Sequence, residues 1–409
     1  MACIVQKFGG TSVATPDLIK KAALRVKAEV DAGHTVVVVV SAMAGATSML
    51  VRYVGDISST YDRAEYDAVV SSGEQVTAGL LALSLQNLDI PARSWLGWQL
   101  PIYTNSHHSQ AKIERIEVDS LLKDLHQGKV AVVTGFQGLS PAGRITTLGR
   151  GGSDTTAVAL AAALNAERCD IFTDVDGVYT ADPRYVTAAG KLEYIAYQEM
   201  LELAAQGAKV LQKESVELAM KHRVRLRVLS SLSEAPGTVV TAEHEFKPLQ
   251  KHIRGLAHTL NDVKITLCAL PQTSSKVEEI KALLNVHQIT IDMLHQNLSL
   301  CGNYMDCAFT VLAIEEERAV GILQRTQNEL QFNDLLRDSH VAKISVIGSG
   351  LQTKLSPSHQ LFQTLREEGI KVQAVAASDI KLSVLISATD AERAVSSLHT
   401  IYQLDAEAE

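Results

Sequence analysis

The segment Thr35–Val40 contains five consecutive valines, and it constrains the fold more than any other feature of the sequence. A short run that is apolar at every position is typical of a central parallel strand, buried on both faces of a sheet. The preceding segment has apolar residues at helical spacing from Leu18 to Val30, and Gly33 marks the predicted end of that helix. Strand and helix patterns then alternate up to residue 245. The sequence therefore predicts an α/β fold in residues 1–245, with a mainly parallel sheet between helical layers.

The pattern changes after residue 245, and the rest of the chain repeats itself. Lys264–Thr266 is echoed by Lys343–Ser345, and Glu317–Val320 by Glu392–Val395, so the repeat length is about 75 to 80 residues. Each copy has the pattern strand, helix, strand, strand, helix. Neither copy contains a plausible acid–base pair or nucleophile, which favours binding and regulation over chemistry. We expect a linker with a first strand, then two small α+β modules, in residues 246–262, 263–338 and 339–409.

Composition and charge narrow the class of protein. The net charge is −8 and there is no dense run of lysine and arginine, which argues against a nucleic-acid-binding surface. The five cysteines are odd in number and scattered through apolar segments, as expected for reduced, buried thiols rather than a disulfide framework or a zinc site. The N-terminus lacks a signal-peptide pattern, and no apolar run approaches membrane-spanning length. We expect a soluble cytoplasmic protein.

Residues Ile4–Ser12 form a candidate phosphate site. A short apolar strand leads into the pair Gly9–Gly10, with Lys7 just before it and a helix start at Thr15–Pro16 just after it. Glycine lets backbone N–H groups approach an anion closely, and lysine adds a full positive charge. An ordinary strand–turn–helix with a surface lysine would have the same pattern, because the segment is neither a Walker A loop nor a dinucleotide fingerprint. Taken alone, the segment leaves both interpretations open.

Further segments contain residues suited to a charged ligand. The loop Leu148–Thr156 places Arg150 among three glycines before a helix, and such a loop is costly in backbone entropy unless it must approach something closely. Arg150 offers a bidentate fork for a carboxylate or a phosphate. Asp154 and Glu74 stand in the first turns of predicted helices, where a carboxylate is either a ligand-binding group or an ordinary cap. The turn Ser41–Ser48 follows the valine strand, where it serves either a ligand or a tight connection.

The segment Thr173–Arg184 follows another predicted strand and alternates acidic residues around Gly177. It resembles a calcium loop superficially, but the later glutamate that such a loop requires is missing at the correct spacing. We therefore exclude an EF-hand.

Together these loops resemble the motifs of the aspartate kinases, which are members of the amino acid kinase family. The repeated half resembles the tandem ACT modules of that family, including Val341–Gly350 and Ile289–Met293. The resemblance covers essentially the whole chain and implies an amino acid kinase fold followed by two α+β ferredoxin-like ACT modules. The matching motifs of the first half are Lys7–Ser12, the turn from Ser41, Ser72–Glu74, Gly149–Asp154, and Thr173–Asp174 with Tyr179–Arg184.

The resemblance implies a phosphotransferase whose acceptor is a carboxyl group. In such enzymes ATP phosphorylates the β-carboxylate of L-aspartate to 4-phospho-L-aspartate, the first step toward lysine, threonine and methionine. The acceptor is already an anion and needs no strong base, so the enzyme must bring two anions together and stabilise an anionic transition state. The resemblance assigns the catalytic roles to Lys7 and to Asp154, which would organise Lys7 and the transfer site.

The same resemblance assigns the binding groups. Arg150 would hold the α-carboxylate of aspartate and Glu74 its ammonium group. Mg²⁺ is expected as a bridge between phosphates, held largely by ATP and water, and the motifs name no dedicated protein ligand for it. ACT modules generally pair edge to edge, so the resemblance also implies a homo-oligomer. The implied ATP-binding residues are Lys7, Phe8, Gly9, Gly10, Ser41, Thr173, Asp174, Tyr179, Asp182, Arg184 and Lys209. The implied substrate-binding residues are Thr47, Glu74, Arg150, Gly151, Gly152 and Ser153.

The regulatory half departs from the family pattern. Thr290 stands where asparagine is usual, Lys371–Val372 replaces Asn-Ile, and Asp379 replaces a glutamate. An effector amino acid needs partners for both of its charged groups, so we expect lysine and threonine to inhibit weakly or not at all. The candidate effector-binding residues are Thr290, Ile291, Asp292 and Gln296 in the first copy, and Lys371, Val372, Ser378 and Asp379 in the second.

Three hypotheses follow. The first is an active aspartate kinase with a regulatory ACT region. The second is another amino acid kinase, acting on glutamate, N-acetylglutamate or UMP, and Arg150 and Glu74 together with the paired ACT copies weigh against it. The third is a catalytically silent, ACT-bearing regulatory subunit, and the presence of Lys7 and Asp154 in a full-length kinase region weighs against that. We adopt the first.

Overall fold

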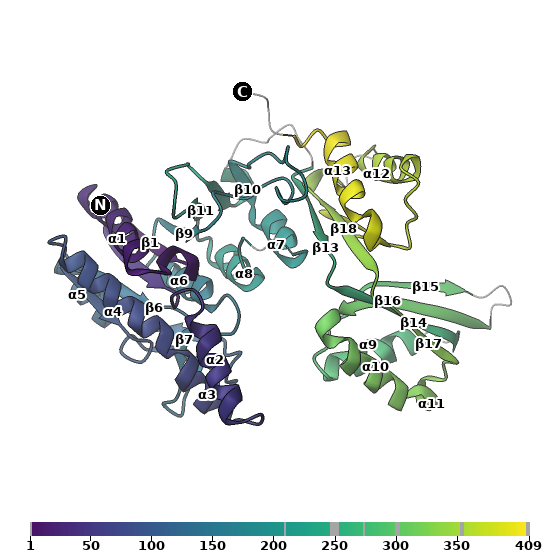
Figure 1. Ribbon diagram of the computed structural model, residues 1–409, viewed down its shortest axis with the longest axis horizontal. Helices are drawn as coiled ribbons and strands as arrows, with labels where there is room; N and C mark the ends of the chain where they lie inside the picture. Colours follow the sequence, from purple (N-terminus) through teal and green to yellow (C-terminus); the bar gives the residue numbers. More distant parts are fainter. Residues whose placement is uncertain are drawn as a thin grey trace. The chain divides into compact units, whose positions relative to one another are not determined.

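The computed structural model describes residues 2–207, 210–245, 253–272, 275–298, 303–351 and 356–405. Contacts divide the chain into two compact units, whose helices and strands are labelled in Figure 1. The segment Tyr179–Gly190 belongs to the second unit, although we predicted one domain for residues 1–245. The first unit consists of Met1–Val178, Lys191–Ala205 and Lys209–Pro248, and the second of Tyr179–Gly190, Gln206–Ala208 and Leu249–Glu409.

An eight-stranded sheet forms the centre of the first unit. Its strand order is β10-β12-β11-β9-β1-β2-β6-β3, and every neighbouring pair is parallel except β11 with β12. The predicted mainly parallel sheet is confirmed. The strands are β1 (Cys3–Phe8), β2 (Thr35–Val40), β3 (Ala92–Trp95), β6 (Val130–Thr134), β9 (Arg168–Thr173), β10 (Tyr194–Ala196), β11 (Leu226–Ser230) and β12 (Thr238–Thr241).

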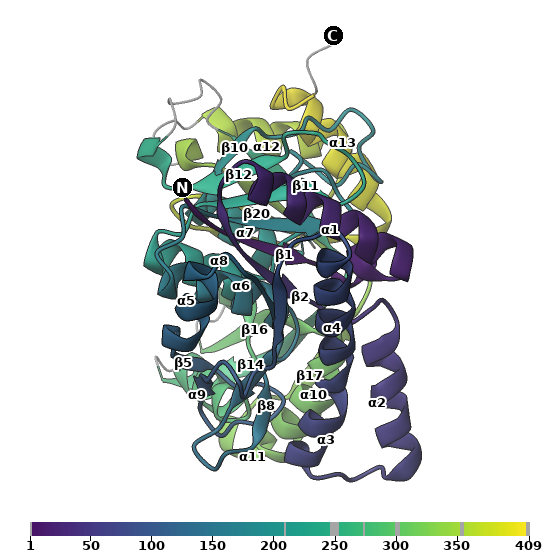
Figure 2. The same cartoon turned by 90° about the vertical axis from the view of Figure 1, so that its left-hand side faces the viewer.

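The valine run forms β2, which lies between β1 and β6 and is buried from Val36 to Val40. Alternate valines of β2 join a core cluster with residues of α1 (Pro16–Asp31) and α4 (Ser72–Gln86). The helix α6 (Gly152–Ala163) contacts β1, β2 and β9, and Figures 1 and 2 show it across the sheet from α1 and α4. The sheet therefore lies between two helical layers, as predicted. The other helices of this unit are α2 (Ala46–Ile57), α3 (Arg63–Val70), α5 (Asp119–His126), α7 (Tyr197–Ala205) and α8 (Lys213–His222).

The sequence of α4 predicts a core-facing row made of Val76, Leu80, Leu81 and Leu83 to Leu85, and only part of that row is buried. Leu81 and Leu85 are buried as predicted, whereas Val76, Leu80 and Leu83 are exposed. A Cβ on Gly73 would lie 2.7 Å from Ala42 Cβ, so the start of α4 packs closely on the turn after β2. A helix that is apolar on several sides has no clear periodic signal to distinguish its faces. The buried row contains mostly small residues: Gly73, Glu74, Thr77, Ala78, Leu81, Ala82 and Leu85.

Two helix boundaries also differ from prediction. The alanine-rich sequence after the Arg150 loop predicts a helix to about Glu167, but α6 ends at Ala163. The sequence from Lys209 to His222 predicts a single helix, but α8 begins at Lys213, after Gln212 at its N-cap.

A second, four-stranded sheet completes the first unit, in the order β5-β4-β7-β8. Its last strand, β8, lies beside α3 and leads directly into the loop that contains Arg150. The strands are β4 (Ile102–Thr104), β5 (Ile113–Ile116), β7 (Gln137–Leu139) and β8 (Ile145–Thr147).

One helical stretch among the described residues, Arg63–Gln86, is long and apolar enough to cross a membrane by length and composition alone. Half of its most apolar window is buried inside the fold, and it contains the buried acidic residues Asp67 and Glu74. A core helix of a globular unit passes the same test. The prediction that no apolar run approaches spanning length is therefore wrong by this measure.

The second unit contains two antiparallel four-stranded sheets, one for each copy of the repeat. The repeated segments Lys264–Thr266 and Lys343–Ser345 lie in β14 and β18, one in each sheet. The first sheet has the order β15-β16-β14-β17, with strands β14 (Asp262–Pro271), β15 (Asp292–Leu298), β16 (Tyr304–Leu312) and β17 (Asp334–Asp338) and helices α9 (Lys276–Val286), α10 (Glu316–Arg325) and α11 (Gln327–Leu330). The second has the order β13-β18-β20-β19, with strands β13 (Gly255–Thr259), β18 (Val341–Ile347), β19 (Ala374–Ala377) and β20 (Lys381–Ser387) and helices α12 (Ser356–Glu367) and α13 (Ala391–Ile401).

Thr180 ties the segment Tyr179–Gly190 to the rest of the second unit. Its carbonyl oxygen accepts a hydrogen bond from Leu256 N (2.7 Å) at β13. Its hydroxyl donates to Leu404 O (3.1 Å) and lies 2.8 Å from His399 Nε2 on α13. His399 is fully buried. These contacts explain why the segment belongs to this unit.

Candidate active site

The carboxyl ends of four neighbouring strands place most of the predicted site residues at one edge of the large sheet. Phe8 at the end of β1 is paired with Val40 of β2 and Phe172 of β9, and Val40 is paired with Thr134 of β6. The loops that follow these strands therefore leave the sheet side by side. In open α/β sheets, ligands bind at this edge.

Lys7, near the end of β1, forms an ion pair with Asp154. Lys7 Nζ lies 2.5 Å from Asp154 Oδ1, and the two side chains are 10% and 11% exposed. Asp154 stands in the first turn of α6, so the pair joins the central strand to the start of this helix. A Cβ on Gly9 would lie only 3.4 Å from Lys7 Nζ, so glycine keeps the space beside the ammonium group open. The ammonium group is therefore held by a carboxylate yet accessible from the loop.

The pair Gly9–Gly10 forms a close contact with the turn after β2. Gly10 opens the short 3₁₀ helix Gly10–Val13, and a Cβ on it would lie 2.9 Å from Ala42 O. Ala44 N donates to Gly10 O (3.1 Å), which fixes the two turns to each other. The Phe8 side chain, by contrast, is fully buried and stacks on Phe172 with ring centroids 4.7 Å apart. Only the backbone of Phe8 can therefore take part in ligand binding.

Glu74 is a buried carboxylate that is satisfied at one oxygen. It is 3% exposed, and Oε1 accepts a hydrogen bond from Ala42 N (3.0 Å). Oε2 is buried and has no hydrogen-bond partner among the described residues. Burial raises the pKa of Glu74 to about 7, against the opposing effect of the Ala42 amide. A cation at Oε2 would offset this cost, because an opposite charge favours the ionised carboxylate.

Arg150 lies in a loop whose backbone conformation favours glycine on both sides of it. Gly149 and Gly151 have φ of 79° and 73°, in the left-handed region, and a Cβ on Gly151 would lie 2.0 Å from Gln212 Cγ. Arg150 is exposed and makes no hydrogen bond or ion pair within the part of the chain that the structure describes. Its guanidinium group is therefore available to a ligand.

Of the remaining predicted residues of the first unit, most lie after strands of this sheet, whereas Gly152 and Ser153 follow β8 of the smaller sheet. Thr47 stands in the first turn of α2, which begins after Gly45 at a φ of 85°, and it is half-buried. Ser41 N donates to Phe8 O (3.1 Å) directly after β2. At the end of β9, Thr173 Oγ1 donates to the exposed Asp174 (3.1 Å). Gly152 and Ser153 begin α6, and Ser153 is 8% exposed.

Three predicted nucleotide residues, Tyr179, Asp182 and Arg184, belong to the second unit. Arg184 binds Asp182 through its backbone N–H (2.9 Å) and through its guanidinium group (3.0 and 2.6 Å). The hydrogen bonds from Arg184 lower the pKa of Asp182. Lys209 lies outside the described residues.

The candidate effector residues of the two copies occur around β15 and β19, which contact each other within the second unit. Asp292 opens β15, and its Oδ2 lies 2.7 Å from Lys343 Nζ of β18, which is also 3.2 Å from Asp262 Oδ2. Burial opposes the charge on Lys343, but Asp262 and Asp292 outweigh it and raise its pKa. Asp292 is therefore already engaged by a cation of the chain. Thr290 and Ile291 precede β15, Gln296 lies in it, Lys371 and Val372 precede β19, and Ser378 and Asp379 follow it.

Among the described residues there is no group of three or more His, Cys, Asp or Glu that could hold a metal ion. The described cysteines Cys3, Cys169, Cys268 and Cys307 are free; Cys169 and Cys307 are buried, whereas Cys3 and Cys268 are only partly buried. Cys301 lies outside the described residues.

One polar residue of the site region escaped the sequence analysis. Asp67 is fully buried in α3, a helix that also contains Val69 and Val70. An acidic residue on the buried side of an apolar helix is the signal that could have identified it.

The fold and the residues at the carboxyl edge of the large sheet together define a class of protein. A model of the amino acid kinase family matches residues 2–230, and an ACT domain model matches residues 344–402. The buried Lys7–Asp154 pair and the half-satisfied Glu74 lie in the part matched to the kinase family.

Similar proteins narrow the class further. The chain is 44% identical over 408 residues to an aspartate kinase of Pseudomonas putida, covering 100% of this chain and 99% of the relative. It is 41% identical over 404 residues to aspartokinase 2 of Bacillus subtilis, covering 99% and 98%. A solved structure of E. coli aspartokinase III in complex with aspartate and ADP superposes with a TM-score of 0.80 at 28% identity, covering 97% and 99%. The chain belongs to the aspartate kinases of the amino acid kinase family.

Proposed function

We propose that this chain transfers a phosphoryl group from ATP to the β-carboxylate of L-aspartate and forms 4-phospho-L-aspartate. One observation carries the proposal. A shielded lysine near the end of β1 is paired with Asp154 of α6, and a buried carboxylate with one unpaired oxygen at the start of α4 binds Ala42 in the turn after β2, while a free guanidinium group stands in the loop just before α6. A lysine suits phosphates, and the other two groups suit the two charges of an amino acid. The product would enter lysine, threonine and methionine biosynthesis.

Lys7 and the Gly9–Gly10 amides would hold the phosphates during transfer. Two anions must meet, so the main requirement is positive charge between them and not a base. Asp154 supports this role because its carboxylate lies 2.5 Å from Lys7 Nζ and keeps the ammonium group oriented. When the phosphates bind, the ammonium group of Lys7 would interact with both the Asp154 carboxylate and the ligand.

Glu74 and Arg150 would hold aspartate at its two ends. The buried Oε2 of Glu74 gains a partner when an ammonium group arrives, and the free guanidinium group of Arg150 can bind the α-carboxylate in a bidentate manner. The hydroxyl groups of Thr47 and Ser153 would donate further hydrogen bonds, and Gly151 and Gly152 would offer their backbone. The β-carboxylate is then the end left to face the phosphates.

Residues after β9 would hold the nucleotide, and the family resemblance assigns Tyr179, Asp182 and Arg184 to nucleotide binding as well. The supporting chemistry is polar and charged side chains: Ser41, Thr173, Asp174, Tyr179, Asp182, Arg184 and Lys209. The possible metal ligands near β9 are hydroxyl and carboxylate oxygens, the ligand type that Mg²⁺ prefers. Among the described residues there is no cluster of side chains that could hold the ion without ATP or water. Mg²⁺ held by the ATP phosphates and water fits such a site, and it would neutralise phosphate charge.

We also propose that the C-terminal unit is regulatory and assembles this cytoplasmic chain into a homo-oligomer. A second structure of E. coli aspartokinase III contains lysine and aspartate. In this chain the residues of the two copies that would correspond to an effector site surround β15 and β19. We propose domain limits at residues 1–245, 246–262, 263–338 and 339–409, with the segment Tyr179–Gly190 of the first range packing in the second unit.

The direct test of the activity is a trapping assay. The purified chain, ATP, Mg²⁺, aspartate and hydroxylamine should yield aspartyl hydroxamate, because hydroxylamine attacks an acyl phosphate. Glutamate in place of aspartate should yield none above background. If the folded protein makes no aspartyl hydroxamate, the proposed activity is wrong.

A further inference from the structure

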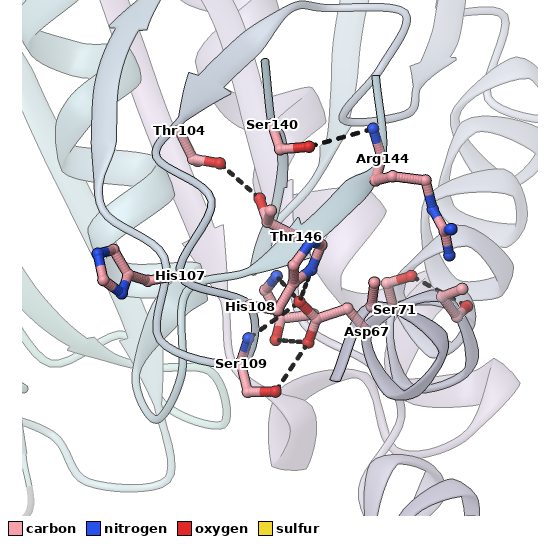
Figure 3. A network of polar contacts seen from close by, with 12 residues as sticks. Asp67, Ser71, Thr104, His107, His108, Ser109, Ser140, Arg144 and Thr146 are labelled. Carbon is pink, nitrogen blue, oxygen red and sulfur yellow. Dashed lines mark hydrogen bonds and ion pairs between the residues drawn. The ribbon is translucent and has the colours of Figure 1, made fainter. Parts of the chain in front are cut away.

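Asp67 of α3 lies fully buried between two segments that are distant in sequence (Figure 3). From the loop after β4, His108 Nδ1 (2.8 Å), Ser109 N (2.9 Å) and Ser109 Oγ (3.2 Å) all approach its carboxylate. From the end of β8, Thr147 N (3.1 Å) and Thr147 Oγ1 (2.6 Å) donate to it. An ionised carboxylate only accepts, so this contact is a hydrogen bond when His108 Nδ1 bears the proton. These five contacts exceed the roughly four lone-pair sites of a carboxylate, so Asp67 has no acceptor capacity left for another group.

The two segments that Asp67 joins form the base of the Arg150 loop. Thr147 is the last residue of β8, and its carbonyl oxygen accepts a hydrogen bond from Ala111 N (2.9 Å). Gly149 follows with its left-handed φ, and a Cβ on it would lie 3.3 Å from Ser109 O. The backbone beside Arg150 therefore rests on the segment that Asp67 holds.

Asp67 is also connected to Glu74 through its own helix. Ser71 N donates to Asp67 O (3.1 Å), and Ser71 ends α3 and starts α4, whose first turn contains Glu74. Ser71 O in turn accepts from Gln137 Nε2 (2.5 Å). One carboxylate thus links the helix that leads to Glu74 with the strand that leads to Arg150.

We propose that Asp67 is a positioning residue that sets the distance between Arg150 and Glu74, and through it the affinity for aspartate. This inference rests on the proposed roles of those two residues. Arg150 stands in an exposed glycine-rich loop without partners of its own among the described residues, so its position depends on the groups at the base of the loop. Small displacements of such groups have large effects on binding and rate.

The first test compares two buried aspartates. Asp67→Asn replaces an acceptor by an N–H donor that faces the donors of Ser109 or Thr147, so we expect the KM for aspartate to rise at least tenfold and the KM for ATP to change less than twofold. The control is Asp124→Asn on α5. Asp124 is 6% exposed and binds Arg93 of β3 and Lys129. It lies just before β6, at the end of that strand opposite to the proposed site. Asp124→Asn should lower the Tm and leave both KM values within twofold. If Asp67→Asn does the same, the inference is wrong.

The second test separates the inference from the proposed function. In an Arg150→Ala background, Asp67→Asn should add less than a twofold rise in the KM for aspartate, because residues that act as a unit are not additive. If the two effects multiply, Asp67 does not act through Arg150, and the proposed site stands. If Arg150→Ala alone leaves the KM for aspartate unchanged, the proposed clamp itself is wrong.

A milder variant covers the case in which Asp67→Asn does not fold. Thr147→Val removes one of the five donors at Asp67 and keeps the shape of the side chain. It should raise the KM for aspartate in the same direction by a smaller factor. A folded Thr147→Val protein with an unchanged KM for aspartate would overturn the inference.

Discussion

Lys7 and Asp154 are two nearly buried charges whose separation is 2.5 Å, and each offsets part of the desolvation cost of burying the other. In Lys7→Ala the carboxylate would remain without its partner beside the proposed phosphate site and would repel the phosphates. We expect kcat to fall by about 10²–10³-fold, the typical effect of losing one group that stabilises transition-state charge. Steady-state hydroxamate formation measures it. Lys7→Arg should recover part of the loss, and a kcat within tenfold of wild type in Lys7→Ala would contradict the role.

Glu74 makes the stability of the free protein depend on pH. Burial raises its pKa from 4.5 to about 7, so the folded state binds more protons than the unfolded state between these values. The free energy of unfolding therefore falls as the pH rises through this window, by on the order of 3 kcal/mol for this group. Glu74→Gln keeps an oxygen for the Ala42 N–H, and it should raise the Tm above that of wild type at pH 8 but not at pH 5. Equal differences at both pH values would contradict the assignment.

The same carboxylate predicts a pH dependence of substrate binding. An ammonium group at Oε2 requires the ionised form, so aspartate binding should release a proton near pH 7. We expect the KM for aspartate to fall as the pH rises from 6 to 8, and this trend should disappear in Glu74→Gln. Initial rates at saturating ATP measure it.

At the scale of elements, the backbone conformation of the loop between β8 and α6, and its packing on Gln212, depend on Gly151. Gly151→Ala would strain the backbone at a φ of 73°, and it would also place the new Cβ 2.0 Å from Gln212 Cγ, so that one of the two residues must shift. Gly143 is a matched control, because its φ is 72° but a Cβ there would contact nothing within 4 Å. Gly143→Ala should cost about 1–2 kcal/mol in unfolding free energy and leave the KM for aspartate unchanged. Gly151→Ala should cost more and raise that KM, and equal effects in the two variants would contradict the role of the contact.

Elements with a strong local signal were predictable from the sequence. The valine run indicated β2 and its burial, and Thr15 caps α1 as expected, accepting from Leu18 N (3.3 Å). The buried face of α4 was predicted only in part, because a helix that is apolar on several sides gives no clear signal to distinguish its faces, and Gly73 packs on Ala42 only in the folded chain. Local motifs likewise indicated the loops of Lys7, Glu74 and Arg150. Asp67 could not be found in this way, because its partners stand 41 and 80 residues away in the chain.

At the scale of the whole molecule, regulation by amino acids is the main open prediction. Asp292 of the first copy is already engaged by Lys343, and Lys371–Val372 replaces the residues usual in the second copy. We expect lysine and threonine, alone and together, to inhibit weakly or not at all, and methionine serves as a further comparison. A titration of activity at an aspartate concentration near its KM measures this. Strong inhibition below millimolar lysine or threonine would contradict the prediction.

The contacts of Thr180 limit how the coding sequence can be divided into separate domains. Through Leu256 and His399, it builds the segment Tyr179–Gly190 into the C-terminal unit, while the chain on both sides of the segment belongs to the other unit. A truncated gene that stops at residue 245 would encode this segment without β13 and α13, the elements on which it packs. The two units are therefore interleaved in sequence, and recombination that exchanges the C-terminal half must also preserve the residues that contact Thr180.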